Sequence, residues 1–81
     1  MHLDCLMMNE NHKADYVNIG NNLRRIRREK GYSQQVLSNM CDVERAKISR
    51  IENASEDIKI STLLKLTTAL EVKLMDLFGE E

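Results

Sequence analysis

Apolar residues repeat at helical spacing along much of the chain between residues 18 and 78. In the first such segment, from about Asn18 to Lys30, the residues Ile19, Leu23 and Ile26 stand at i, i+4 and i+7. At about 100° per residue these positions share one face of an α-helix. Pro is absent and Gly occurs three times, so few residues interrupt a helix. The spacing therefore predicts an all-α fold.

The same spacing predicts four further helices. Gly31 ends the first helix, and Ser33 caps the second, which runs to Cys41. Asp42 and Val43 then form a tight connection, because Asp is among the few non-Gly residues that tolerate a left-handed backbone. The later elements are a third helix at 44–52, a loop at 53–59, a fourth helix at 60–70 and a short fifth helix at 74–78. We therefore expect a compact five-helix bundle.

The chain is long enough for one hydrophobic core and too short for two, because small chains bury little of their surface. Residues 1–16 lack a helical stripe, so we interpret them as a flexible or partner-dependent N-terminal extension. Residues 17–81 form the expected domain. No run approaches 18 apolar residues and no signal peptide is evident, so we expect a cytoplasmic protein without a membrane partner.

The cysteines do not predict a disulfide or a metal site. Cys5 and Cys41 form no CxxC motif, which fits a reducing compartment. His2 and Cys5 have a spacing that metal ligands use, but two candidate ligands are too few for a site. We therefore expect no metal.

Basic charge is concentrated in the middle of the chain. The formal net charge is −1, but residues 18–53 contain eight Lys and Arg against four acidic residues. A domain that turns one side toward DNA phosphates has such an uneven distribution of basic charge. A solvated helix face would show the same cluster, so the charge alone does not decide between these readings.

The second and third expected helices fit a helix-turn-helix, in which two short helices are joined by a tight turn. In the third helix Ile48 and Ile51 mark the buried side, and the opposite side carries small and cationic residues. These are Ala46, Ser49 and Arg50 on the outer side and Arg45 and Lys47 on its flanks. A major groove about 12 Å wide admits one such helix. We therefore predict binding to double-stranded DNA through the helix at 44–52.

The segment IRREKGYSQQVLSNMCDVERAKISRIEN resembles the Xre and Cro-like helix-turn-helix family of bacterial and phage repressors. The resemblance covers about Ile19 to Phe78 and includes the Ser33-Gln34 pair. It implies the lambda-repressor-like form of the bundle. The chain is also similar to the controller proteins of restriction-modification systems and to some antitoxins, and the sequence does not separate these roles.

The resemblance implies roles for individual residues. Base-reading positions are matched by Arg45, Ala46, Ser49 and Arg50. Their chemistry agrees, because Arg can bond guanine O6 and N7, Ser can donate or accept, and Ala can touch a thymine methyl group. Phosphate-binding positions, which fix register without reading sequence, are matched by Gln34, Lys47, Asn53, Arg24, Arg25 and Arg28. Arg27 and Glu52 are similar to a family pair that links the first helix to the end of the third.

Three departures from the family pattern concern the turns. Asp42 and Ala54 stand where the family usually has Gly. Glu56 and Asp57 acidify a loop that in relatives often lies along the DNA. Near phosphates these carboxylates would repel, so we expect weaker DNA binding or a differently placed loop.

The leading hypothesis is a transcriptional repressor or regulator that binds a roughly palindromic operator as a homodimer. A single small helix-turn-helix contacts few base pairs, which favours a dimer. The expected dimer interface is the apolar tail Leu74, Met75, Leu77 and Phe78, although this tail could instead only cap the core. The alternative function is a protein-interaction module, or an antitoxin-like protein, with weak or no sequence-specific DNA binding. No catalytic arrangement, cofactor or small-molecule ligand is expected.

Overall fold

The computed structural model of the protein describes residues 12–79, so most of the expected N-terminal extension lies outside the described range. The structure contains α1 (Lys13–Glu29), α2 (Gln34–Cys41), α3 (Arg45–Glu52), α4 (Ile60–Leu70) and the 3-10 helix η3 (Leu74–Leu77). No strand occurs in this range, which confirms the all-α prediction. None of these helices is both long enough and apolar enough to cross a membrane.

The prediction of five α-helices is wrong, because the last element is one 3-10 turn. Asp76 N donates to Lys73 O at 2.9 Å, and Phe78 N donates to Met75 O at 3.0 Å. Both bonds span three residues, as in a 3-10 helix. Four residues are too few to repay the nucleation of an α-helix, so the bundle has four α-helices in the described residues.

α1 begins at Lys13, earlier than the expected start near Asn18. The Tyr16 hydroxyl donates to Asp57 Oδ1 at 2.6 Å, and Lys13 Nζ donates to the carbonyl of Ala54 at 3.3 Å. Each contact joins residues that are 41 positions apart in the sequence. Periodicity along the sequence cannot reveal such contacts, so the first turn of the helix was missed.

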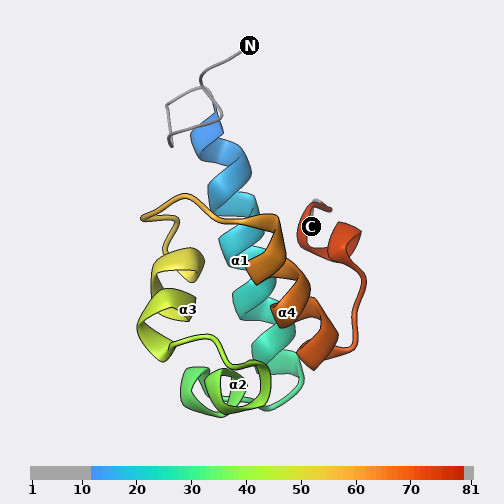
Figure 1. Ribbon diagram of the computed structural model, residues 1–81. Helices are drawn as coiled ribbons and strands as arrows, with labels where there is room; N and C mark the ends of the chain where they lie inside the picture. The colour runs from blue at the N-terminus through green and yellow to red at the C-terminus, as the bar shows by residue number, and fades with distance from the viewer. Residues whose placement is uncertain (1–11, 80–81) are drawn as a thin grey trace.

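α1 is the axis around which the other helices pack (Figure 1). In this view α3 lies on one side of α1, α4 on the other, and α2 across its lower end. α1 packs against α3 and η3, and α2 packs against both α3 and α4. The fully buried apolar side chains are Leu23, Leu37, Ile48, Ile51, Leu66, Leu70 and Leu77. This shared core holds α2 and α3 as one unit and thereby fixes the face of α3 that points to solvent.

Ser33 and Asp42 set the ends of α2, as the sequence predicts. The Ser33 hydroxyl accepts a hydrogen bond from the backbone N–H of Val36 at 3.0 Å. Asp42 has φ 61°, a left-handed conformation, and Val43 after it is buried. The turn between α2 and α3 is therefore short and anchored in the core.

Candidate nucleic-acid interface

α3 turns one side toward the core and the other toward solvent. Ile48 and Ile51 have no exposed surface. The residues expected to face base edges lie on the other side, where Arg45, Ala46 and Arg50 are exposed and Ser49 is half-buried. Among residues 12–79 the Arg45 guanidinium has no hydrogen-bond or ion-pair partner. Its donors are therefore available to an external acceptor.

Arg27 and Glu52 form a buried ion pair between α1 and the end of α3. Arg27 Nε donates to Glu52 Oε2 at 2.7 Å, and Arg27 Nη2 donates to Oε1 at 3.0 Å. Arg27 Nη1 also donates to the carbonyl of Tyr32 at 2.8 Å. The structure thus brings together the two residues that the sequence suggested as a structural pair, with bidentate geometry.

Two further donors reach the same carboxylate. Gln34 Nε2 lies 3.0 Å from Glu52 Oε1, and Arg24 Nε lies 3.4 Å from it. Burial raises the pKa of Glu52, but the hydrogen bonds from Arg27, Gln34 and Arg24 outweigh burial and hold this pKa below its ordinary value. The hydrogen bond to Glu52 likewise raises the pKa of Arg27 despite its burial. Both groups are therefore charged, and α1, α2 and α3 meet at this carboxylate.

Gly20 lies where α1 crosses the C-terminal end of α3. A Cβ at this position would stand 2.5 Å from the carbonyl oxygen of Ile51 and 2.7 Å from that of Glu52. Only Gly permits two backbones to approach this closely. Apolar periodicity alone assigns no role to Gly20, although a Gly inside a helical pattern lowers stability and so often indicates close packing.

Asn22 holds the C-terminal segment against α1 and was also missed. Its side chain is fully buried, and Nδ2 donates to the carbonyls of Leu77 at 2.8 Å and Gly79 at 2.7 Å. Nearby, Asn18 Nδ2 donates to the carbonyls of Phe78 and Gly79, both at 3.2 Å. The available signal was a polar residue three positions after Ile19, on the apolar face of α1.

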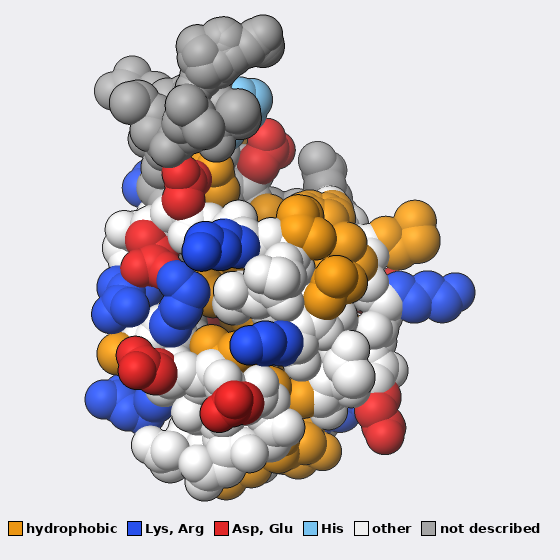
Figure 2. Space-filling model, in the orientation of Figure 1, with side chains coloured by type: hydrophobic (Ala, Val, Ile, Leu, Met, Phe, Trp, Pro, Cys, Tyr) orange, Lys and Arg blue, Asp and Glu red, His pale blue; other side chains and the backbone are white. Residues whose placement is uncertain are grey.

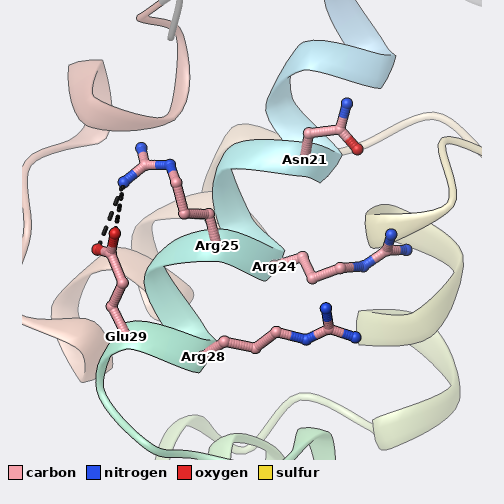
Figure 3. Close-up of a pocket in the computed structure, with 5 residues that line it drawn as sticks. All are labelled: Asn21, Arg24, Arg25, Arg28 and Glu29. Atoms are coloured by element: carbon pink, nitrogen blue, oxygen red, sulfur yellow. Dashed lines mark hydrogen bonds and ion pairs between the residues drawn. The ribbon is translucent and has the colours of Figure 1, made fainter.

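Three arginines of α1, Arg24, Arg25 and Arg28, line a hollow on its exposed side, but they do not act as one group (Figure 3). Arg24 and Arg28 extend toward α3, whereas Arg25 turns away and pairs with Glu29 at 3.3 Å. Arg24 Nη2 donates to Asn53 Oδ1 at 2.8 Å. Arg28 has no hydrogen-bond or ion-pair partner within the described part of the chain. The structure thus brings Arg24, Arg28 and Asn53 to the side of α3 and leaves Arg25 apart.

The acidic loop after α3 is paired with cations. Glu56 Oε2 lies 2.5 Å from Lys47 Nζ, and Glu56 Oε1 lies 2.6 Å from Arg50 Nε. The hydrogen bonds from Lys47 and Arg50 lower the pKa of Glu56. Asp57 accepts its hydrogen bond from Tyr16. The two carboxylates are therefore hydrogen-bonded within the protein. Glu56 is bonded to Lys47 and Arg50, two of the residues expected to contact DNA.

The turns on either side of α3 show why the family usually has Gly at two positions where this chain does not. Asp42 has φ 61° and Ala54 has φ 56°. Both values lie in the left-handed region that Gly adopts without strain. Gly is therefore the unstrained choice at both positions, and this chain forms the same turns without it.

The described residues offer no cluster suited to a metal ion. His2 and Cys5 lie outside the described range. Within residues 12–79 no group of three or more His, Cys, Asp or Glu side chains could hold a metal. Burial raises the pKa of the Cys41 thiol, as expected of a structural cysteine.

This fold, with two helices joined by a tight turn and the second presenting cationic residues to solvent, defines a class of protein, the helix-turn-helix regulators. The HTH_3 helix-turn-helix family model matches residues 23–77, and the chain belongs to this family. It is a family of DNA-binding transcription regulators. The resemblance to the Xre and Cro-like group is thereby confirmed.

Two of the similar proteins are named as control or controller proteins, and a third is named as a transcription factor. The chain is 31% identical over 65 residues to control protein C.MunI from a Mycoplasma species, a match that covers 79% of this chain and 88% of the relative. It superposes on the restriction-modification controller protein C.AhdI from Aeromonas hydrophila with a TM-score of 0.81 and 33% identity, covering 85% of this chain and 100% of that chain. The hypothetical transcription factor NHTF from Neisseria gives a TM-score of 0.77 and 27% identity, covering 90% of this chain and 82% of that chain.

Proposed function

We propose that the protein is a sequence-specific transcriptional regulator that binds a roughly palindromic operator as a homodimer, with α3 in the major groove. The observation that carries this proposal is the solvent face of α3. Arg45 and Arg50 are exposed there beside the small residue Ala46, and the buried Arg27–Glu52 pair fixes the helix from behind. An α3 held in one orientation can present the same donors to each half-site.

In this proposal Arg45 and Arg50 read bases. Ala46 and Ser49 allow α3 to come close to the base edges. The Arg45 guanidinium has no partner among residues 12–79, so it can bond guanine O6 and N7 without breaking an internal bond. Arg50 can bond a guanine in the same way, but its Nε is already bonded to Glu56, so reading a base competes with this internal bond. Arg45 is therefore the better prepared of the two readers.

The phosphate contacts in this proposal come from both flanks of α3. Arg24 and Arg28 extend toward α3 from α1, and Asn53 accepts from Arg24 at the end of α3. Gln34 at the start of α2 and Lys47 on α3 complete the set. Arg25 is the weakest of the expected phosphate residues, because it points away and pairs with Glu29.

The second copy is proposed to bind on the side of the molecule away from α3. In Figure 2 charged side chains gather over the side where α3 lies, and hydrophobic side chains gather over the start of α4 and over η3. We define the apolar patch as Ile60, Leu64, Met75 and Phe78, which are 56%, 47%, 68% and 45% exposed.

The expected tail contributes only part of this patch. Leu77 is fully buried in the core of its own chain, and Leu74 is partly buried against that core. Met75 and Phe78 therefore remain as the exposed part of the tail, and α4 supplies the rest. Two half-sites read by such a dimer would lie about one helical turn, roughly 34 Å, apart.

Selection of bound duplexes from a random pool tests the proposed function. The purified full chain should enrich a roughly palindromic sequence, and two chains should sediment with each selected duplex. Affinity for it should fall as salt rises, because phosphate contacts release counterions. A pool with no enriched sequence, together with weak binding that ignores sequence, would contradict the proposal and favour the protein-interaction alternative.

Control of a restriction-modification system is the more particular role that we propose. Both C.MunI and C.AhdI are named as control or controller proteins, and the chain spans most of the length of each. The genes beside the one for this chain test this role. An endonuclease and a methyltransferase gene would support it, whereas a toxin gene or phage genes would contradict it and favour an antitoxin or a phage repressor.

A further inference from the structure

Glu56 binds two cations of α3 with its two carboxylate oxygens. Oε2 accepts from Lys47 Nζ at 2.5 Å, and Oε1 accepts from Arg50 Nε at 2.6 Å. Lys47 and Arg50 are three residues apart, so they lie side by side on one face of the helix. Both were expected to contact DNA. The carboxylate therefore neutralises part of the surface that would meet the nucleic acid.

The loop that carries Glu56 is anchored on both sides of this residue. Before it, the Ser55 backbone N–H and hydroxyl donate to the carbonyl of Arg50 at 2.9 Å and 3.2 Å. After it, Asp57 accepts from the Tyr16 hydroxyl of α1 at 2.6 Å. The Glu56 side chain is 24% exposed. It is therefore held beside Lys47 and Arg50 by its neighbours, and it is not a freely moving surface carboxylate.

We propose that Glu56 competes with DNA for Lys47 and Arg50. Carboxylate and phosphate oxygens accept the same charge-assisted hydrogen bonds from ammonium and guanidinium groups, so the two acceptors are alternatives for these donors. Breaking the bonds of Lys47 and Arg50 to Glu56 costs free energy on every DNA sequence. This cost is offset most where Arg50 reaches a guanine edge. Glu56 thus limits binding to random DNA. This inference rests on the proposed function, because it assumes that this face of α3 meets DNA.

The test compares wild type with Glu56→Gln on a random-sequence duplex and on the selected operator over a series of salt concentrations. Glu56→Gln should bind the random duplex roughly three- to tenfold more tightly, as expected from removing exposed ion pairs that hold the two cations. The slope of log K against log salt should steepen by about one to two, because each further phosphate contact adds about 0.9.

Asp57→Asn is the matched control. It removes the same charge one residue further along, but within the described residues Asp57 is bonded to Tyr16 of α1 and not to α3. Its effect on affinity should stay within about twofold, since salt screens a charge that lies at a distance from the DNA contacts. Thermal melting of each variant shows that the fold is retained.

Three results would overturn the inference. The first is an unchanged affinity and salt slope in Glu56→Gln, and the second is an equal gain in Asp57→Asn, which would indicate net charge alone. The third is weaker operator binding by Glu56→Gln, which would mean that Glu56 orients Arg50 for reading. Failure of the proposed function is a separate result, in which selection enriches no operator and wild type binds all duplexes equally. A tighter Glu56→Gln complex with a steeper slope would then still support the competition.

Discussion

At the scale of single residues, Glu52 connects the elements that position α3, the helix that we propose faces DNA. It is the last residue of α3, and its carboxylate accepts from Arg27 and Arg24 of α1 and from Gln34 of α2. A buried carboxylate is stable only when its charge is compensated in this way. Glu52 therefore belongs to the support of the candidate interface and not to its contact surface.

Glu52 should make the fold sensitive to acid. Burial raises its pKa, but the hydrogen bonds from Arg27, Gln34 and Arg24 bring the pKa below the ordinary value, which is about 4.3 for an unfolded chain. Because the folded-state pKa is the lower one, this stabilisation is complete above about pH 4.3 and is lost as the pH falls through the folded-state pKa. Urea unfolding between pH 7 and pH 3 should show this loss in wild type.

Glu52→Gln is the variant that isolates the effect. It should lower the free energy of unfolding at pH 7 by about 3 to 5 kcal/mol, because Arg27 is left buried without its counter-ion. Its stability should then depend less on pH below about 4.3. Glu56→Gln serves as the control. It removes another carboxylate whose pKa is lowered, but it leaves Glu52 and its bonds intact. Equal pH slopes in wild type and Glu52→Gln would contradict this account.

The sequence predicted well the residues whose conformation depends only on their neighbours in the chain. Ser33 as a cap and Asp42 in a left-handed turn need only their own neighbours, and both occur as expected. The roles of Gly20 and Asn22 depend on contacts with backbone atoms of residues that are distant in the sequence. Such contacts become visible only when the helices are placed in space.

At the scale of elements, the crossing of α1 and α3 determines where the outer face of α3 points. The helices approach so closely at Gly20 that no Cβ fits there, and the Arg27–Glu52 pair bonds them next to this point. α2 also packs against α3. These contacts with α1 and α2 together set the face that α3 turns to solvent.

Gly20→Ala should destabilise the fold. Ala ordinarily favours a helix over Gly by about 0.5 to 1 kcal/mol, but here its Cβ would meet two backbone carbonyls, which cannot rotate away. We expect a net loss of about 1 to 3 kcal/mol, typical of overpacking, measured by urea unfolding. Gly79→Ala is the control, because nothing lies within 4 Å of a Cβ at that position. A Gly20→Ala chain as stable as wild type would show that the crossing is not tight.

The element boundaries were predictable where apolar periodicity was strong. α2, α3 and α4 begin and end close to the expected residues. The first turn of α1 was not predicted, because it is stabilised by Tyr16 and Lys13 against the loop after α3. The last element was predicted as a helix of the wrong kind, since the periodicity of Leu74 and Leu77 fits a 3-10 turn as well.

At the scale of the whole molecule, two surfaces face different ways. The side at α3 is charged, and the apolar patch covers the start of α4 and η3 (Figure 2). In Figure 1 these elements lie on opposite sides of α1. A dimer joined through the apolar patch would therefore leave both copies of α3 accessible to DNA.

Met75→Glu should disrupt the proposed dimer. Met75 is 68% exposed, so the change places a charge in the patch without altering the core of the chain. Sedimentation should show wild type as a dimer, with a dimer dissociation constant at least about tenfold lower than that of Met75→Glu. Val36→Glu, at an exposed position on α2, should leave the dimer intact. Wild type that sediments only as a monomer, with and without DNA, would contradict the dimer.

The most direct test of the central claim is the base preference of arginine variants on the selected operator. Arg45→Ala and Arg50→Ala should each relax the preference at one base pair per half-site and weaken operator binding by about 1 to 3 kcal/mol. Arg28→Ala, which removes an expected phosphate contact, should weaken all sequences similarly and reduce the salt slope by about 1. If both α3 variants instead lose equal affinity on every sequence, α3 does not read the operator.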